Sequence, residues 1–174
     1  MQLSQITKVA LSEATKAKKN REVPVGAVVF NKKKIISKAY NMIILANNPL
    51  GHAEILAMQK AIKKLKTKNL SNYSLYVTLE PCLICSYVIS KFRVSTLYFG
   101  AYDIKHGSIQ NGERFFLNSK KIYVPEIYGG IAEKESSNLL KSFFKDIRKK
   151  LWANIISIKT TFPRNTFAYC ICLS

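Results

Sequence analysis

Two short segments of this 174-residue chain hold residue types that bind metal ions and move protons. The first is His52-Ala53-Glu54 and the second is Pro81-Cys82-Leu83-Ile84-Cys85. Each segment is weak evidence alone, because a single histidine is often a hydrogen-bonded core or surface residue and a CxxC pair can be redox-active or merely buried. Two cysteines and one histidine together, however, are typical zinc ligands. The two segments therefore predict a zinc site formed by His52, Cys82 and Cys85.

The spacing of the two cysteines favours one shared metal ion. Cys82 and Cys85 are three residues apart on a predicted helix, so both sulfurs lie on one face. The N-terminus of that helix directs unpaired N–H groups and a positive dipole end at them, which favours the thiolate form. Three other residues are candidates for a fourth ligand, but none has the paired spacing of a second zinc-binding motif: His106, Cys170 and Cys172. We therefore expect a site left open to water, as in catalytic zinc sites.

A carboxylate stands two residues beyond the predicted histidine ligand. From that position Glu54 can lie near the metal without binding it. Zinc lowers the pKa of its bound water to about 7, and a nearby carboxylate can take a proton from that water and return it to a leaving group. Attack of hydroxide on an amidine-like ring carbon, followed by departure of the amine, is hydrolytic deamination. Glu54 is therefore the expected proton shuttle of such a reaction.

The first part of the chain predicts a helix, a hairpin and a second helix, which must bring His52 to the site. Apolar residues recur at helical spacing in residues 1–19. Residues 23–30 form an apolar, β-branched run, and three lysines at 32–34 separate it from Ile35 and Ile36, as in a hairpin with a basic turn. A helix should then run from about residue 52 to residue 66, with its apolar stripe toward the core.

The second part predicts a strand, a helix and a strand, which must position the cysteines. Residues 74–79 have strand composition, residues 82–92 follow as a short helix, and residues 94–100 form a second β-rich run. Such a βαβ unit pairs its strands in parallel. We expect a further strand at residues 121–124 and a helix from about residue 132 to residue 150. Residues 1–150 are therefore predicted to form one α/β domain.

Residues 151–174 differ from the rest of the chain. They are apolar without periodicity and are interrupted by Pro163. This composition favours a lightly packed or mobile C-terminal extension, and we assign it no role.

The composition indicates a partner class. The chain has 28 Lys and Arg residues against 10 Asp and Glu residues, a net charge of +18, which predicts attraction to nucleic acid or to an acidic membrane surface. No run approaches the roughly 18 apolar residues of a membrane span, and the N-terminus lacks the pattern of a signal peptide. Four cysteines are too few for a disulfide scaffold. We therefore expect a soluble, cytoplasmic protein in a reducing compartment.

The pattern H-x-E with P-C-x-x-C is the signature of zinc-dependent nucleoside and nucleobase deaminases. Within that superfamily, which includes the cytidine and deoxycytidylate deaminases, the chain resembles the bacterial tRNA-specific adenosine deaminases. The resemblance covers about residues 3–150 and rests on six matching segments: residues 21–30, Asn41, and residues 52–58, 76–85, 98–103 and 139–150.

The resemblance implies a fold, an activity and partners. The fold would be the cytidine-deaminase-like three-layer α/β/α sandwich with a five-stranded mixed sheet. The activity would be zinc-dependent conversion of the wobble adenosine of a tRNA anticodon stem-loop to inosine, with release of ammonia. The family implies a homodimer with one zinc ion per subunit and an RNA site drawn from both subunits. His52, Cys82 and Cys85 would bind zinc, and Glu54 would be catalytic.

Other positions of the family pattern imply substrate contacts. Asn41 matches a residue that contacts base and sugar, and the backbone N–H groups near Ala53 and Cys82 would help to position the hydroxide or the base. The remaining matches are to pocket or loop-contact positions: Val25, Leu79, Glu80 and Phe144. The chain departs from the family pattern at three places, which are Gly51 in place of Ala, Tyr102 in place of Arg, and the loop at 106–113.

Two other functions are compatible with the same residues. A deaminase of free cytidine, guanine or another small nucleobase would need the same zinc site, but it would not need a basic surface. A zinc-stabilised RNA-binding module without activity would tolerate replacement of Glu54. Salt-sensitive binding to tRNA, if measured, would exclude the first alternative, and loss of turnover with zinc retained in Glu54→Ala would exclude the second.

Overall fold

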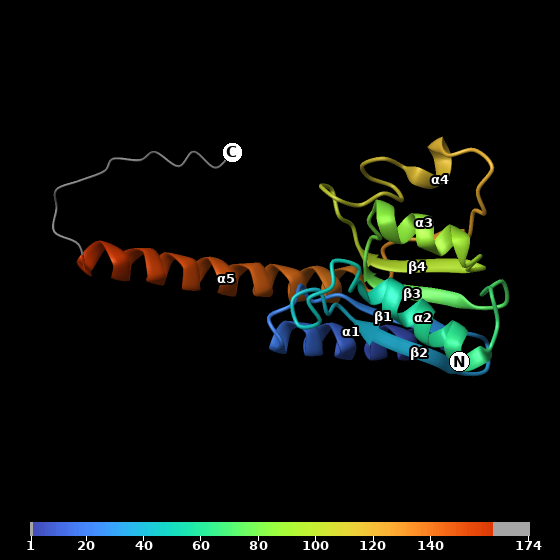
Figure 1. Ribbon diagram of the computed structural model, residues 1–174, viewed down its shortest axis with the longest axis horizontal. Coiled ribbons are helices and arrows are strands. Elements are labelled where there is room, and N and C mark those ends of the chain that lie inside the picture. Colours follow the sequence, from blue (N-terminus) through green and yellow to red (C-terminus); the bar gives the residue numbers. More distant parts are fainter. Residues whose placement is uncertain (1, 162–174) are drawn as a thin grey trace. The chain divides into compact units, whose positions relative to one another are not determined.

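A five-stranded mixed sheet lies at the centre of the computed structural model, which describes residues 2–161 (Figure 1). The strand order is β2-β1-β3-β4-β5. The strands are β1 (Gly26–Phe30), β2 (Ile35–Tyr40), β3 (Ser74–Leu79), β4 (Thr96–Ala101) and β5 (Glu126–Tyr128). Strand β1 pairs antiparallel with β2 and β3, whereas β3–β4 and β4–β5 are parallel. The predicted α/β fold with a five-stranded mixed sheet is thus confirmed.

Helices cover both faces of the sheet. Helix α1 (Leu3–Lys19) buries Ile6 and Ala10 against Val28 and Tyr76 on one face. On the other face, α2 (Ala53–Leu65) and α3 (Leu83–Lys91) pack on the sheet through the larger core cluster, to which α2 contributes Met58. The helices predicted at residues 1–19, 52–66 and 82–92 are therefore confirmed to within two residues at each end.

The hairpin and the parallel pair are as predicted from the sequence. Strands β1 and β2 flank the three-lysine turn, and the side chain of Asn31 accepts hydrogen bonds from the backbone N–H groups of Lys33 and Lys34. Strand β3 occupies the predicted range, and β4 begins two residues later than expected. Because β3 leads directly into α3, its carboxyl end delivers Cys82 to the edge of the sheet where the candidate site lies.

The strand predicted at residues 121–124 is wrong, because β5 lies at Glu126–Tyr128 instead. Lys121 has φ of 58°, outside the β region. The N–H of Tyr123 donates to Ser90 Oγ (3.1 Å), so this apolar segment is tied to α3 and is not part of the sheet. Pairing beside β4 begins only at Glu126, whose N–H donates to Ser95 O at 3.0 Å.

The last helix is longer than the sequence predicts. Helix α5 runs from Glu133 to Thr161, and not only to residue 150. A four-residue helix that was not predicted, α4, spans Phe115–Asn118.

The chain divides into two compact units between residues 143 and 144, so the first part of α5 belongs to the first unit and the rest belongs to the second. The division at residue 150 into a deaminase domain and an extension stays a prediction, and Cys170 and Cys172 lie outside the described residues. No helix among residues 2–161 is long and apolar enough to cross a membrane.

Candidate zinc-dependent active site

The three predicted metal ligands lie together. The Nδ1 atom of His52 is 3.4 Å from the Sγ of Cys85 and 3.7 Å from the Sγ of Cys82. All three donor atoms lie within 4.8 Å of one another. His52 is the N-cap residue of α2 and Cys82 is the N-cap residue of α3, so two helix N-termini converge on this point. One imidazole and two sulfurs at such separations fit a zinc ion, with room for a non-protein ligand in the fourth position.

Hydrogen bonds within the donor group favour a thiolate at Cys82. A hydrogen bond from the Cys85 thiol, followed by the contribution of His52, lowers the pKa of Cys82 to about 4 against the opposing effect of burial. The same hydrogen bond, together with burial and the nearby Glu54 carboxylate, raises the pKa of Cys85. The hydrogen bond with Cys82 raises the pKa of His52. The cluster is therefore poised to exchange protons for a cation.

Glu54 is a buried carboxyl group beside the ligands. It lies in the first turn of α2, and only 4% of its surface is exposed. Burial raises the pKa of Glu54 to about 7, and the Cys82 thiolate contributes in the same direction. A group that titrates near neutral pH can both accept and return a proton during one reaction cycle. The environment of Glu54 thus suits the proton-shuttle role that the sequence suggests.

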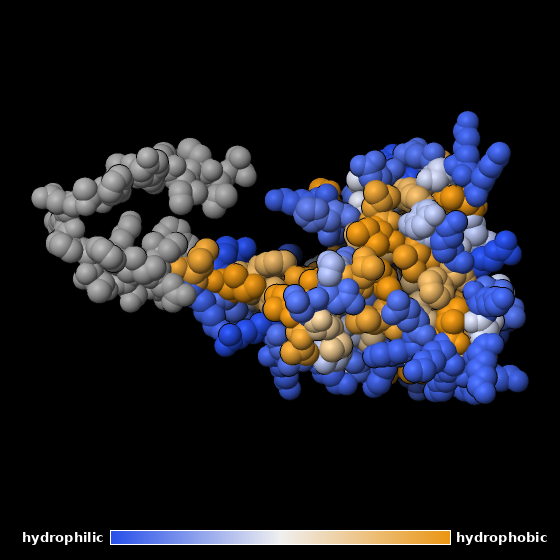
Figure 2. Space-filling view, viewed as in Figure 1, coloured by the Kyte–Doolittle hydropathy of each residue, from blue (hydrophilic) through white to orange (hydrophobic). Residues whose placement is uncertain are grey.

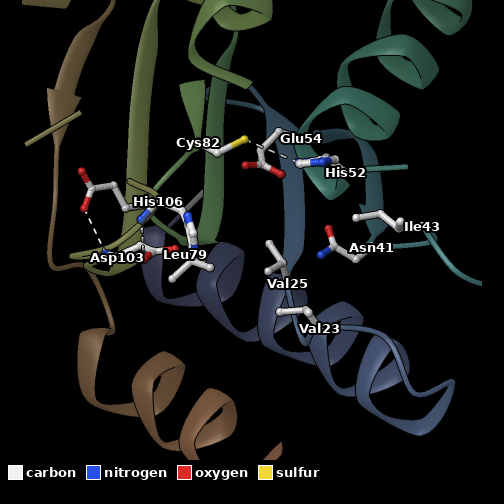
Figure 3. Close-up of a pocket in the computed structure, with 11 residues that line it drawn as sticks. Val23, Val25, Asn41, Ile43, His52, Glu54, Leu79, Cys82, Asp103 and His106 are labelled. Atoms are coloured by element: carbon white, nitrogen blue, oxygen red, sulfur yellow. Dashed lines mark hydrogen bonds between the residues drawn. The ribbon is translucent and has the colours of Figure 1, made fainter. Parts of the chain in front are cut away.

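A pocket of about 210 Å³ opens beside these groups (Figure 3). Its walls come from the segment before β1, the segment after β2, the start of α2, the end of β3 with the turn that follows it, and the loop after β4. They consist of Val23, Val25, Asn41, Ile43, His52, Glu54, Leu79, Glu80, Cys82, Asp103 and His106. Of the predicted substrate contacts, Val25, Asn41, Leu79 and Glu80 are therefore all in the pocket wall.

Sequence reasoning did not assign four of the lining residues to the pocket: Val23, Ile43, Asp103 and His106. Val23 and Asp103 lie inside segments that carry the family resemblance, so their place in the pattern was an available signal. The sequence offers His106 as a candidate fourth zinc ligand. It lies in the pocket wall but outside the group of donor atoms formed by His52, Cys82 and Cys85.

Asn41 and Ala53 are joined directly. The Oδ1 of Asn41 accepts a hydrogen bond from the N–H of Ala53 at 2.9 Å. That backbone group was expected to help position the substrate, but here it holds the asparagine in place. Among the described residues, no hydrogen bond reaches the Nδ2 of Asn41, which leaves this donor available to the pocket.

The family departure at Gly51 has a local reason. The residue is buried between the loop that follows β2 and the start of α2, and its carbonyl accepts a hydrogen bond from Met42 N at 2.8 Å. A Cβ at this position would lie 2.6 Å from the carbonyl oxygen of Met42. The loop is therefore fitted to glycine, and the start of α2 is held closely against it.

Phe144 lies on α5 in the second unit, and 42% of its surface is exposed. Its predicted contact with substrate stays a prediction.

Comparison with known proteins identifies the family. Residues 1–101 match the family described as the cytidine and deoxycytidylate deaminase zinc-binding region. The chain is 46% identical over 141 residues to the tRNA-specific adenosine deaminase of Rickettsia bellii, a match that covers 80% of this chain and 97% of that protein. The chain belongs to the tRNA-specific adenosine deaminase family. Its zinc cofactor, predicted from the sequence, is confirmed by the family match and by the donor group.

A more distant relative and two solved structures are also similar to this chain. The tRNA-specific adenosine deaminase of Bacillus subtilis is 36% identical over 82% of this chain and 89% of its own length. A structure from studies of A-to-I editing by tRNA:A34 deaminases superposes with a TM-score of 0.77 at 38% identity, covering 79% of this chain and 99% of the other. Guanine deaminase from Nitrosomonas europaea, at 21% identity and a TM-score of 0.69, shares the fold over 79% of this chain and 82% of its own.

Proposed function

We propose that this chain hydrolytically deaminates adenosine to inosine at wobble position 34 of a tRNA anticodon loop and releases ammonia. The observation that carries the proposal is the buried Glu54 carboxyl beside the His52, Cys82 and Cys85 donor group, in a member of this family. The net charge of +18 supports a polyanionic substrate. An anticodon loop is already unpaired, so little free energy is needed to place its base in a small pocket.

The residues divide the chemical work among them. His52, Cys82 and Cys85 hold zinc, which when bound supplies a Lewis acid that makes water nucleophilic near neutral pH. Glu54 would take one proton from the attacking water and place it on the purine ring nitrogen beside the reacting carbon. It would then take the remaining proton from the new hydroxyl group and place it on the amine, which leaves as ammonia when the C–N bond breaks. Glu54 is buried beside the donor group, so its carboxyl is within the pocket where both transfers take place.

The pocket walls orient the adenosine. Asn41 donates from Nδ2 to the nucleoside, while Ala53 fixes the asparagine through its backbone N–H. Val25 and Leu79 supply apolar contacts to the base. Phe144 contributes a contact to the anticodon loop from α5.

We propose that the chain acts in the cytoplasm as a homodimer that binds the tRNA anticodon stem-loop. The dimer proposal is supported by apolar side chains on α3 that are about half exposed: Leu83, Ile84 and Tyr87. Figure 2 shows hydrophobic side chains gathered in the middle of the face that carries α2 and α3. Burial of such a surface against a second copy would remove apolar area from water.

The substrate class is tested by offering the zinc-loaded protein several substrates in parallel. These are an anticodon stem-loop with adenosine at the wobble position, the same stem-loop with guanosine there, and free adenosine, cytidine and guanine. We expect deamination of the first substrate alone, seen as inosine and ammonia, with KM rising as salt is added because phosphate contacts are screened. Deamination of the others would be seen as ammonia with their own products. Turnover of a free base or nucleoside without turnover of the stem-loop would contradict the proposal and favour a small-molecule deaminase.

A further inference from the structure

One side of the pocket is formed by the loop after β4, residues 102–114. This pocket-wall loop carries Asp103 and His106, both of which line the pocket. The carboxylate of Asp103 accepts hydrogen bonds from the N–H groups of Lys105 (3.1 Å) and His106 (3.0 Å), so the first turn of the loop is built around Asp103. The position of both lining residues therefore depends on what holds this loop.

The buried carboxylate of Glu80 holds it. The Oε1 atom accepts three backbone N–H groups, from Ile109 (3.1 Å), Gln110 (2.8 Å) and Asn111 (3.0 Å). The Oε2 atom accepts the N–H of Asp103 (3.0 Å) and the Nδ2 of Asn111 (2.7 Å). Glu80 is 2% exposed, and a carboxylate offers about four lone-pair sites. Five donors therefore occupy its accepting capacity, and none is left for a substrate.

The same loop is bonded to the turn that carries the cysteines. The carbonyl of Pro81 accepts the N–H of Ser108 (3.0 Å) and its hydroxyl (3.1 Å). The hydroxyls of Ser86 and Ser108 lie 2.7 Å apart, and Gly107 forms an antiparallel bridge with Cys82. The pocket-wall loop and the zinc-binding turn are thus one hydrogen-bonded unit.

The pocket-wall loop packs closely against Glu80 at Gly107. A Cβ at this position would lie 2.4 Å from the carbonyl oxygen of Asp103 and 2.5 Å from the Cδ of Glu80. A side chain here would have to displace either the loop backbone or the Glu80 carboxylate. The close approach therefore requires glycine at residue 107.

We propose that Glu80 is a positioning residue for the deamination, one that fixes the pocket-wall loop and does not touch the RNA. The expected effect of Glu80 on KM rests on the proposed function, whereas its contacts with the loop do not. A carboxylate is required because it only accepts hydrogen bonds. In Glu80→Gln, the amide NH₂ must face either the three N–H donors now at Oε1 or the two donors now at Oε2. The hydrogen bonds on that side are therefore lost, and the part of the loop that they hold is released.

The test compares Glu80→Gln with the unmutated zinc-loaded protein. We expect one zinc ion per chain in both, faster amide hydrogen exchange at residues 103 and 109–111 in the variant, and a KM for the anticodon stem-loop raised about tenfold because the pocket wall is displaced, with a smaller change in kcat. The split between KM and kcat is the readout that separates positioning of the pocket wall from a general loss of folded protein.

Two further variants complete the test. Glu13→Gln is the matched control, because Glu13 is also a buried carboxylate but is bonded to lysines of α1 and β2 and lies outside the pocket. It should leave KM and loop exchange unchanged. Gly107→Ala disturbs the same contact from the loop side with Glu80 intact, and it should raise KM and loop exchange as Glu80→Gln does.

Unchanged loop exchange in Glu80→Gln, or loss of kcat with KM unchanged, would overturn the proposal. Loss of zinc from Glu80→Gln would also overturn it, since Glu80 would then act on the metal site. If the unmutated protein makes no inosine, the proposed function fails, but the exchange and zinc measurements still decide whether Glu80 holds the loop.

Discussion

The side-chain oxygen of Asn41 accepts the backbone N–H of Ala53 at 2.9 Å, which ties the pocket asparagine to the first residue of α2. His52 precedes that residue and Glu54 follows it. One hydrogen bond therefore connects the group that would recognise the nucleoside to the segment that carries a metal ligand and the proton shuttle. The oxygen of the Asn41 amide holds the start of α2, and its nitrogen is the group that we propose donates to the nucleoside.

Substitutions at Asn41 should separate these two functions. Asn41→Asp keeps an oxygen for Ala53 at the positive end of α2, but it replaces the Nδ2 donor with an acceptor and adds a negative charge to the pocket. We therefore expect KM for the stem-loop to rise at least about tenfold, while the melting temperature falls less than in Asn41→Ala. Asn41→Ala also loses the acceptor at the start of α2 and should be less stable by about 1 kcal/mol. Calorimetry and steady-state kinetics on both variants check this. Equal stability of the two variants would contradict the structural role of the oxygen.

Cys82→Ser should damage stability and activity together. Its sulfur is one of three donors within 4.8 Å of one another, and metal binding contributes free energy to folding. We expect less than one zinc ion per chain, a lower melting temperature and little inosine. Chelation of zinc from the unmutated protein should cause the same losses, and returned zinc should reverse them. Metal analysis beside thermal unfolding measures both effects, and a Cys82→Ser protein that keeps full zinc content would exclude Cys82 as a ligand.

The pH dependence of stability should contain a contribution from Glu13. Burial alone would raise the pKa of this carboxyl, but Lys16 (2.7 Å) and Lys38 (3.1 Å) outweigh it and hold the pKa below its ordinary value of 4.5. A depressed folded-state pKa means that the ion pairs stabilise the protein above the unfolded-state pKa and that this stabilisation is lost as pH falls through the folded-state pKa.

Glu13→Gln removes that contribution. At pH 7 the variant should be less stable than the unmutated protein by about 1 kcal/mol, and the difference should shrink as the pH falls below 4.5. Melting temperatures of both proteins at pH 7, 5 and 3 give the comparison, in which effects of acid on the zinc site are common to both. A difference that is constant across this range would argue against the ion pairs as its source.

The short-range patterns of the sequence were sufficient to predict the centre of the site. His52 and Glu54 lie two residues apart at one helix start, and Cys82 and Cys85 lie one turn apart at another, so local spacing fixes each pair. The strand β3 could be predicted for a similar reason, because a β-branched and aromatic run ends at Leu79, two residues before Pro81.

Features that depend on distant parts of the chain could not be predicted in this way. The apolar segment before Pro125 has strand composition, but its hydrogen bond to Ser90 and the positive φ of Lys121 exclude it from the sheet. The role of Glu80 depends on four residues from a loop more than twenty positions later in the chain. No periodic pattern in the sequence predicts the contact between Glu80 and this loop.

The proton transfer that we assign to Glu54, beside the zinc ligands, is required for deamination of adenosine within an anticodon loop. It is tested most directly by single-turnover assay of inosine formation on a stem-loop with a wobble adenosine, using the unmutated protein and Glu54→Ala with equal zinc content. We predict inosine from the unmutated protein and a rate at least about 100-fold lower from the variant, with binding of the stem-loop retained. Equal rates from both proteins, or no inosine from the zinc-loaded unmutated protein, would contradict the account.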